Sequence, residues 1–554
     1  MRLFFTRMAT DWRVFATLLA ILFGVFILTL PLATALQFGP DEGMELTKAF
    51  IYAKHSELTP QLWNDQPALF TEILSLAFKV FTPTILVARL VAVAFAVLFS
   101  ISLWGIATGL AGEFAGLLAV IFFFLAPFVP SLIVSPMLEL PAFSLALAAF
   151  WMLMAAYRKG SFRLLAGSAL LYGCALNIKL TPAIMLPAIC TYGCLTKFNR
   201  SPGHGKESQV QTKKAPLLAL GALSPLAAWA LAGCAIFLFL LWMIPPGIHW
   251  TLLWKSHANA SNNYLFRTSP TYAFNPKELL FEHPDGVLGS IIGCYVLVFT
   301  RQWRVLVFLT VFVATVFTVH TFHRPWWSYY YLHFIIPMSL LSAIGLGALI
   351  KQAARLGGKT TAQGIRSLIA LMALACLLMT MTTSALPRFC GQYVALRYVP
   401  RIENSALLKT IMLYKKQARW LYCLDAKYSF FSQIVSPPEL AVLPVKRFYS
   451  GAISFGGILD YLRKYEPEEV LISTVSERDP DWTTFLERNY FKAYEKNGYA
   501  LHISNKLAPQ TAATLNSTNS PPEGRVPPPG VPPAAAIRTS PTISLPGGRV
   551  PDRN

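Results

Sequence analysis

The chain has 554 residues, of which 55% are hydrophobic and only 13% are charged. This composition excludes an ordinary soluble globular protein, whose chain carries far more charge. The net charge of +20 would suit a nucleic-acid partner, but the Lys and Arg residues concentrate in short loops between apolar runs. That distribution is typical of cytoplasmic loops beside anionic lipid headgroups, so we expect no nucleic-acid binding.

The apolar residues fall in runs of about 17–25, enough to cross a hydrocarbon core about 30 Å thick as helices. The eleven predicted spans are 14–36, 85–110, 114–134, 138–157, 162–178, 180–195, 216–245, 286–300, 303–320, 330–350 and 367–387. The first run is too long for a cleaved signal peptide and has no small-residue cleavage site. The short apolar segment 67–80 is predicted to be a re-entrant or interfacial helix, because counting it as a crossing would invert every later loop.

A cytoplasmic N-terminus places all the basic loops in the cytoplasm, which supports both the spans and the orientation. It places two long connections, 37–66 and 246–285, on the exoplasmic side, together with everything after about Pro387. The compact loops favour a multi-pass protein of a bacterial plasma (inner) membrane, with the membrane of the endoplasmic reticulum as the alternative.

The predicted fold is an all-α polytopic membrane domain of about eleven helices, followed by a small exoplasmic α/β domain and a disordered tail. We place these parts at 1–390, which includes the first outer loop 37–66, at 391–507 and at 508–554. Strand-like runs at 420–424, 470–473 and 499–503 alternate with helical patterns at 457–465 and 482–489, and Asn497-Gly498 indicates a hairpin turn. The tail is rich in Pro, Gly, Ser and Thr and cannot bury a core.

Two acids, Asp41 and Glu42, come directly after the first span, at its outer end. Behind them, Leu46, Ala49 and Phe50 begin the apolar face of an interfacial helix. Acids beside a helix end are commonly solvated loop residues. Here other functional groups are predicted on the same side of the membrane, which makes the two acids candidates for catalysis.

Glu139 begins the fourth span among apolar neighbours. A carboxylate near membrane depth costs a few kcal/mol unless something pairs with it. Metal binding, a hydrogen bond to a sugar and an ion pair with a basic residue all remain open for Glu139. Lys179 lies in the outer hairpin between spans five and six, where a lone basic residue is unexpected. It suits a phosphate ligand, and the alternative is snorkelling to lipid headgroups.

A polar and aromatic cluster lies between the ninth and tenth spans. An interfacial aromatic belt accounts for Trp326 and Tyr330, but it does not require His320, His323 and Arg324 beside them. These three side chains could bind a phosphate or pyrophosphate, with the aromatic faces against a sugar or prenyl chain. The histidine spacing alone is weak evidence for zinc.

Together these residues supply what sugar transfer from a lipid phosphate needs. A carboxylate takes the proton of the acceptor, and cationic groups, or a divalent metal ion held by Asp41 and Glu139, stabilise the departing phosphate. The helices offer an apolar groove for the prenyl tail. No Gly-rich phosphate loop is present, so we predict no nucleotide site and no other cofactor.

The chain resembles the GT-C glycosyltransferases, in the branch of the protein O-mannosyltransferases and the aminoarabinose transferase of lipid A. Asp41-Glu42 matches the acidic motif of the first outer loop, and Trp63 to Phe70 is similar to a later Lys-Pro-Pro-Leu segment. Glu139-Leu-Pro corresponds to an Asp-x-Pro motif, Asn177 to Lys179 to a Thr-Lys-Gly region, and Tyr329 to Pro337 to a Tyr-Tyr-Leu…Pro stretch. The resemblance covers roughly residues 10–350.

The resemblance implies a dolichyl- or undecaprenyl-phosphate sugar as donor, a protein, lipid or glycan as acceptor, and a catalytic first-loop acid. Our hypothesis is an inverting displacement with Asp41, or Glu42, as general base, phosphate held by Lys179 and the His320, His323 and Arg324 cluster, and Glu139 orienting the sugar or a metal. Two departures put the phosphate contacts and the metal in question: Gln66 replaces the usual Lys, and Glu139 replaces the usual Asp.

Three other classes compete with this hypothesis. A transporter or flippase would carry charged or helix-breaking positions in the middle of its spans. A ligase or acyltransferase using another lipid-linked donor would be expected to keep its functional residues in a late outer loop. A non-catalytic scaffold could share the fold. The donor sugar, the acceptor, the oligomeric state, the role of the α/β domain and a disulfide between Cys390 and Cys423 stay open.

Overall fold

The computed structural model describes residues 12–196, 218–244, 250–353 and 361–507. The predicted disordered tail, 508–554, lies outside these residues. The chain divides into two compact units. We call Met1–Ala33, Asp65–Leu253 and Ser261–Tyr398 the membrane unit, and Thr34–Asn64, Trp254–Ala260 and Val399–Asn554 the sheet unit. Most of the outer loop 37–66 therefore groups with the sheet unit.

Within the described residues of the membrane unit, six helical segments are long and apolar enough to cross a membrane. They are α5 (Ile85–Ala111), α8 (Glu139–Lys159), Pro225–Met243 of α11 (Leu218–Met243), α16 (Trp303–Phe322), Ser328–Ala353, which contains α17 (Tyr331–Ala353), and Gly364–Arg397, which joins α18 (Thr361–Thr380), η5 (Met381–Ala385) and α19 (Leu386–Arg397). Shorter apolar helices are α2 (Trp12–Thr29), α6 (Glu113–Leu125), α9 (Phe162–Ile178), η2 with α10 (Thr181–Met185 and Leu186–Leu195) and α15 (Pro284–Phe299). Each of the eleven predicted spans thus coincides with an apolar helix.

The remaining helices of the membrane unit are short. They are α4 (Leu69–Val80), α7 (Val129–Val134), α13 (Tyr264–Thr268), η3 (Pro270–Tyr272), α14 (Pro276–Glu282) and η4 (Ser328–Tyr330). The segment predicted to be re-entrant forms α4, whose 12 residues rise only about 18 Å at 1.5 Å per residue. This length is well short of a bilayer core, as the prediction requires.

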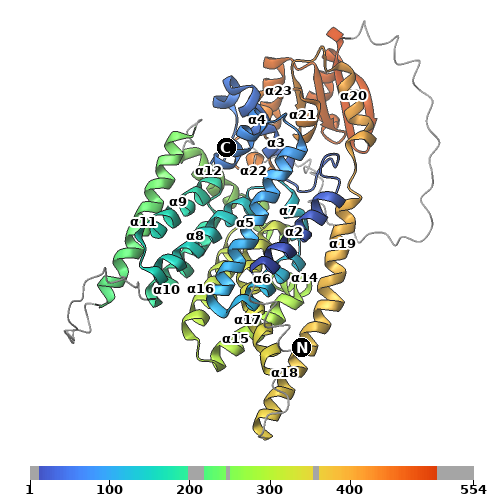
Figure 1. The fold of residues 1–554 in the computed structure, drawn as a ribbon. Coiled ribbons are helices and arrows are strands. Elements are labelled where there is room, and N and C mark those ends of the chain that lie inside the picture. The colour runs from blue at the N-terminus through green and yellow to red at the C-terminus, as the bar shows by residue number, and fades with distance from the viewer. Residues whose placement is uncertain (1–11, 197–217, 245–249, 354–360, 508–554) are drawn as a thin grey trace, which may run out of the picture. The chain divides into compact units, whose positions relative to one another are not determined.

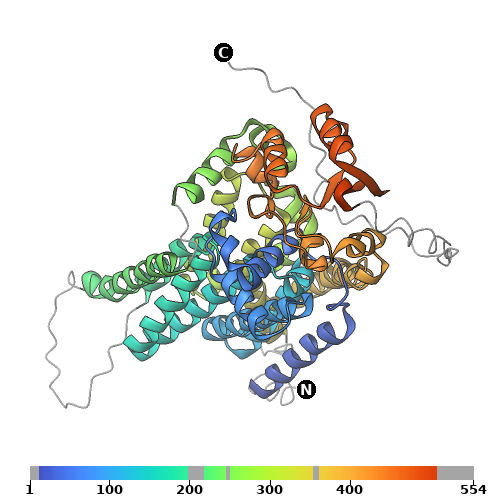
Figure 2. The same ribbon diagram turned by 90° about the horizontal axis from the view of Figure 1, so that it is seen from above.

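Small residues let the helices of the membrane unit approach closely. Helix α8 packs against α5 and α9, and α11 packs against α9. The green helix α11 lies beside its teal neighbours in both views (Figures 1 and 2). In α15, Gly289 and Gly293 form a Gly-x-x-x-Gly pattern that faces α17. A Cβ atom on Gly293 would lie 2.1 Å from the carbonyl oxygen of Leu341, so only glycine permits this contact, a common device in membrane helix packing.

The sheet unit contains a four-stranded sheet in the order β1-β2-β4-β3. Its strands are β1 (Leu421–Cys423), β2 (Glu469–Ser473), β3 (Tyr490–Lys496) and β4 (Tyr499–Ser504). Strands β1 and β2 are parallel, and the other two pairs are antiparallel. Three of the strands were predicted. The turn between β3 and β4 is at Asn497 and Gly498, which both have positive φ, as a tight hairpin requires.

Helices cover the two faces of this sheet with separate apolar clusters. They are α20 (Ala406–Tyr414), α21 (Lys427–Ser432), α22 (Val445–Tyr449), α23 (Phe455–Tyr465) and α24 (Pro480–Asn489), with short turns η6 (Ile402–Asn404), η7 (Pro438–Leu440), η8 (Ser476–Arg478) and η9 (Asn505–Leu507). Helices α23 and α24 confirm the two helical patterns predicted for this region. Of the two cysteines whose pairing was open, Cys390 is exposed, Cys423 is buried, and both are free.

The outer loop forms α3 (Glu42–Lys54) and η1 (Ser56–Gln61), while α12 (Trp250–Asn262) contributes the residues 254–260 of the sheet unit. Helix α3 packs on α21, where a Cβ atom on Gly43 would lie 2.8 Å from the backbone nitrogen of Lys427. The Thr47 hydroxyl donates to the carbonyl of Ala426 over 2.8 Å. An apolar face alone was predicted for this helix, but its polar Glu45 and Lys48 are buried as well.

Candidate functional site

Glu139 and Lys179 form an ion pair inside the membrane unit. Glu139 is the first residue of α8, and Lys179 follows the last residue of α9. Both are buried, with 1% and 7% of their surfaces exposed. The two helices pack along each other, so the start of α8 and the end of α9 bring the carboxylate and the ammonium group together. Of the roles that the sequence left open for Glu139, the structure supports the ion pair.

Two tyrosines lie against the ammonium group of Lys179. Its Nζ atom is 5.4 Å from the ring centre of Tyr329 and 5.6 Å from that of Tyr330. Aromatic faces attract cations at such distances, and both rings are buried. A Lys ammonium is a compact charge with rotatable donors that suits a phosphate. The site therefore combines a cation with an apolar aromatic wall.

His320 does not stand at the surface as a free phosphate ligand would. It is 3% exposed, and its Nε2 atom lies 2.9 Å from Nδ1 of His333. The ring of Tyr330 stacks on both imidazoles, with centroids at 5.3 and 5.2 Å, and Trp326 meets His320 edge-on at 4.9 Å. Sequence reasoning missed His333 because it falls in an apolar span directly after the tyrosines.

The other two residues of the predicted cationic cluster lie differently. The guanidinium of Arg324 donates to the carbonyl of Arg267, and its own carbonyl accepts from the Ser261 hydroxyl at 2.9 Å. His323 is half-buried just beyond the end of α16. The structure therefore brings together Lys179, Tyr330 and His320, but it turns the side chain of Arg324 toward α13.

Asp41 and Glu42 belong to the sheet unit and differ in burial. Glu42 is fully buried, and its carboxylate accepts the backbone N–H of Phe38 over 2.7 Å, which closes the turn before α3. Asp41 is half-buried at the N-cap of α3 and makes no capping hydrogen bond with its side chain. Glu42 therefore has a structural contact, and Asp41 is the more exposed of the two acids.

A second polar group of the sheet unit escaped the sequence reading. The Lys48 ammonium lies 2.5 Å from the Glu45 carboxylate and 3.5 Å from the side-chain oxygen of Asn64. The spacing of three residues on one helix was the available signal. Next to Asn64, the Trp63 ring lies 5.4 Å from the guanidinium of Arg447, which links the end of the outer loop to α22.

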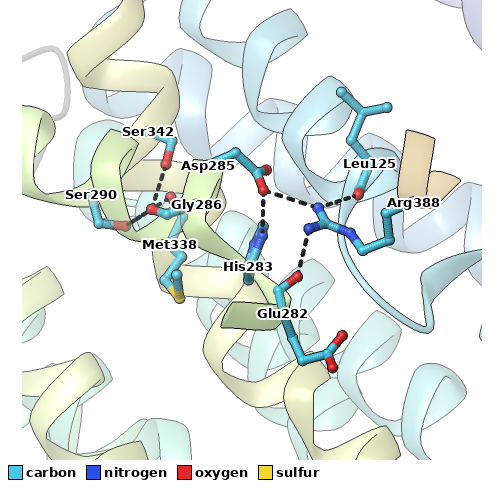
Figure 3. A network of polar contacts seen from close by, with 9 residues as sticks. All are labelled: Leu125, Glu282, His283, Asp285, Gly286, Ser290, Met338, Ser342 and Arg388. Carbon is cyan, nitrogen blue, oxygen red and sulfur yellow. Dashed lines mark hydrogen bonds and ion pairs between the residues drawn. The ribbon is translucent and has the colours of Figure 1, made fainter. Parts of the chain in front are cut away.

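A network at the start of α15 also involves residues that were not predicted (Figure 3). The Asp285 carboxylate lies 3.0 Å from the Arg388 guanidinium and 3.3 Å from Nδ1 of His283. Arg388 also donates to the carbonyls of Glu282 at 2.5 Å and Leu125 at 2.8 Å. The network ties α19 to the start of α15 and the end of α6. Its ion pair and hydrogen bonds hold these three helices together.

The described residues contain no group of three or more His, Cys, Asp and Glu side chains that could hold a metal ion. Glu139 is paired with Lys179, and the metal site predicted for Asp41 and Glu139 stays a prediction.

Comparison with known proteins identifies the fold. Residues 65–229 match the family model of the dolichyl-phosphate-mannose-protein mannosyltransferases. The structure of ArnT from Cupriavidus metallidurans bound to undecaprenyl phosphate matches with a TM-score of 0.53 and 12% identity, over 88% of this chain and 97% of that one. The chain has a GT-C glycosyltransferase fold.

Two further structures agree with this GT-C assignment. ArnT in the apo state matches with a TM-score of 0.54 and 12% identity, over 88% of this chain and 97% of that one. The oligosaccharyltransferase of Archaeoglobus fulgidus in the apo form matches with a TM-score of 0.50 and 10% identity, over 89% of this chain and 74% of that one. No curated protein sequence matches significantly. The resemblance to the ArnT and protein mannosyltransferase branch is therefore confirmed by the fold and by one family match.

Proposed function

We propose that the chain transfers a sugar from a polyprenyl-phosphate donor to an acceptor hydroxyl or amine on the exoplasmic face of the membrane. The acceptor atom forms a bond to the anomeric carbon, the bond from that carbon to the phosphate oxygen breaks, and the configuration inverts. The phosphate leaves with the electron pair of the broken bond. The proton of the acceptor passes to a base.

The observation that carries this proposal is the ion pair between Glu139 and Lys179, set against Tyr329 and Tyr330 in a GT-C fold. A buried ion pair is a poor source of net stability, because both charges lose their water. It is well suited to an exchange of partners, since Lys179 can rotate toward an arriving phosphate while Glu139 accepts a hydrogen bond from a hydroxyl of the sugar. ArnT, which is similar in fold, binds undecaprenyl phosphate in its crystal structure, and this lipid agrees in class with the proposed donor.

Asp41 is our candidate for the general base. It is half-buried, whereas Glu42, the acid beside it, is fully buried and accepts the backbone N–H of Phe38. A positioned carboxylate contributes typically 10²- to 10⁴-fold to a proton transfer. We propose that Glu42 has a structural role: its hydrogen bond to the backbone of Phe38 fixes the loop and so keeps Asp41 at the start of α3.

The positions of charges disfavour a transport function. A translocation route would need charges in the middle of its spans. Glu139 and Lys179 lie instead at the ends of α8 and α9, and Arg89 is the fifth residue of α5, where it donates to the carbonyl of Leu32 over 2.7 Å. These groups lie at helix ends, where substrate would arrive from one side of the membrane.

The test is sugar transfer from radiolabelled undecaprenyl-phosphate sugars, by purified protein in lipid with a cell-envelope extract as acceptor. We expect the wild type to transfer at least one such sugar and Asp41→Asn to lose about 10²- to 10⁴-fold in rate. Glu57→Gln is the matched control, because Glu57 is an exposed acid of the same loop. Equal rates for Asp41→Asn and the wild type would remove the base assignment, and no transfer by the folded wild type from any donor would favour a transporter or scaffold.

A further inference from the structure

The histidine pair of the membrane unit has a geometry that its packing alone does not explain. His320 lies in the last turn of α16 and His333 near the start of α17, with 3% and 1% of their surfaces exposed. Their facing nitrogens are 2.9 Å apart, a normal hydrogen-bond distance. One imidazole must therefore donate the shared proton and the other must accept it.

The two outer nitrogens of this pair, Nδ1 of His320 and Nε2 of His333, are buried and have no hydrogen-bond partner among the described residues. Each buried unsatisfied polar atom costs about 1–3 kcal/mol. A neutral imidazole carries one N–H. When His320 donates the shared proton, His333 therefore presents its N–H outward at Nε2; when His333 donates, His320 presents the outward N–H. The two forms differ only in the position of protons.

Contacts place this pair beside the proposed donor site. Phe143 lies one helical turn after Glu139 on α8, about 6 Å along the axis, and its ring centre is 4.7 Å from that of His333. Tyr330 stacks on His333 at 5.2 Å and also lies 5.6 Å from the ammonium group of Lys179. The histidine pair therefore shares Tyr330 with Lys179 and contacts α8 one turn after Glu139.

A positive charge on the pair would be costly, because both rings are buried in an apolar region. A neutral pair can pass a proton without becoming charged, since a proton that leaves at one end is replaced by a proton that arrives at the other. Such a device moves protons through an apolar region where an ion would be costly.

We propose that His320 and His333 form a proton relay that protonates the departing lipid phosphate; this inference rests on the proposed function. As the bond from the anomeric carbon to the phosphate oxygen breaks, that oxygen takes the proton from Nε2 of His333. The shared proton moves from Nε2 of His320 to Nδ1 of His333, and His320 takes a proton from water at Nδ1. One proton enters and one leaves, so the pair ends neutral in its other form.

The relay has a clear electrostatic benefit. A leaving phosphate monoester without a proton is a dianion, which is costly at the edge of an apolar region and exceeds the single charge of Lys179. Protonation leaves a monoanion that matches one ammonium group.

The test measures protons taken up when the full-length protein in lipid nanodiscs binds undecaprenyl phosphate. Calorimetric titration in two buffers of different ionisation enthalpy gives the number of protons per bound lipid at pH 7.5 and 8.5. We expect close to one proton for the wild type, with affinity falling about tenfold per pH unit in this range, as linkage requires. His333→Phe, which keeps a ring in the stack, should still bind lipid but take up almost none.

His320→Phe provides a second variant, because it leaves His333 in place but removes the group that replaces its proton. Equilibrium proton uptake should then stay near that of the wild type, while the rate of sugar transfer should fall by about 100-fold. His55→Phe, which removes a half-exposed histidine of the sheet unit, should behave as the wild type in both measurements. Undiminished proton uptake in His333→Phe, undiminished transfer in His320→Phe, or no uptake by the wild type despite lipid binding, would overturn the relay and leave the proposed function standing. Failure of the wild type to bind undecaprenyl phosphate would contradict the proposed function itself.

Discussion

Among its described residues, the membrane unit holds two buried ion pairs that differ in the chemistry of the cation. Arg388 meets Asp285 and two backbone carbonyls through a planar guanidinium, with His283 on the same carboxylate oxygen. Lys179 meets Glu139 beside aromatic rings. The first pair is fixed by hydrogen bonds to several elements, which suits a clamp. The second uses a compact, rotatable charge, which suits exchange with a ligand.

Burial of a charged pair therefore does not by itself indicate function. Both carboxylates have an exposed fraction of 1% or less. What separates the pairs is the chemistry of the cation and of its surroundings: backbone carbonyls around Arg388, aromatic faces around Lys179. The following substitutions test whether this difference in construction is a difference in role.

The largest expected effect on stability comes from Arg388→Met. It leaves Asp285 buried beside His283 without its guanidinium partner, and breaking a buried pair costs about 3–5 kcal/mol. Thermal unfolding in lipid should show a large drop in midpoint, while transfer per folded molecule stays near that of the wild type. A stable variant with low transfer would move the Asp285 network into the functional site.

Lys179→Met should lower kcat/KM for the lipid donor by about 100-fold, or roughly 2.7 kcal/mol at 1.36 kcal/mol per tenfold. The reason is the loss of the charge that the departing phosphate meets. Lys79→Met is the matched control, because Lys79 is an exposed lysine of α4. Equal losses in the two variants would point to a general effect of membrane-surface charge.

The double substitution Glu139→Gln with Lys179→Met separates stability from activity. It removes both charges, so no uncompensated ion remains buried, and the free energy of unfolding should recover by about 1–3 kcal/mol over Lys179→Met alone. Transfer should stay low. Recovery of transfer together with stability would show that the ion pair is only structural.

The smallest expected effect comes from a buried carboxyl group of the sheet unit, Glu469. Burial raises the pKa of Glu469 to about 9, and the negative charge of Glu468 adds to this increase. The carboxyl group is therefore protonated in the folded state at pH 7. The stability that it contributes is fully present below about pH 4.5, the pKa of an unfolded Glu, and is lost as the pH rises toward 9. Glu469→Gln should raise the free energy of unfolding by about 1–2 kcal/mol at pH 8.5 and by little at pH 4.5.

Unfolding of the full-length protein at the two pH values checks this. An equal effect of Glu469→Gln at both would contradict a protonated carboxyl in the folded state. The cysteine of the neighbouring strand gives an independent check, since burial raises the pKa of Cys423 to about 12. This thiol should resist alkylation at pH 8 until the sheet unit unfolds.

Hydropathy could predict the helices, because every apolar run must satisfy its own backbone in lipid. It could not predict the partners. Arg388 and Asp285 are 103 residues apart, and nothing in either segment marks the other. Glu139 and Lys179 were each identified as unusual in an apolar setting, and an ion pair was one of the roles considered for Glu139, but only the packing of α8 on α9 joins them.

Two further elements show where the sequence pattern was insufficient. Strand β3 was missed because it follows α24 without a break and contains Lys492, Glu495 and Lys496, residues that are uncommon in strands. His333 was missed because the tyrosines before it already had an explanation in the aromatic belt. In both cases the deciding contacts, β3 with β4 and His333 with His320, are tertiary.

The most direct test of the account compares the two ion pairs in one measurement, the affinity of purified variants for undecaprenyl phosphate in nanodiscs. We predict that Lys179→Met weakens binding by about 100-fold, while Arg388→Met, measured on the folded fraction, stays within about twofold of the wild type. Equal affinities for Lys179→Met and the wild type would contradict the claim that the Glu139–Lys179 pair receives the donor phosphate.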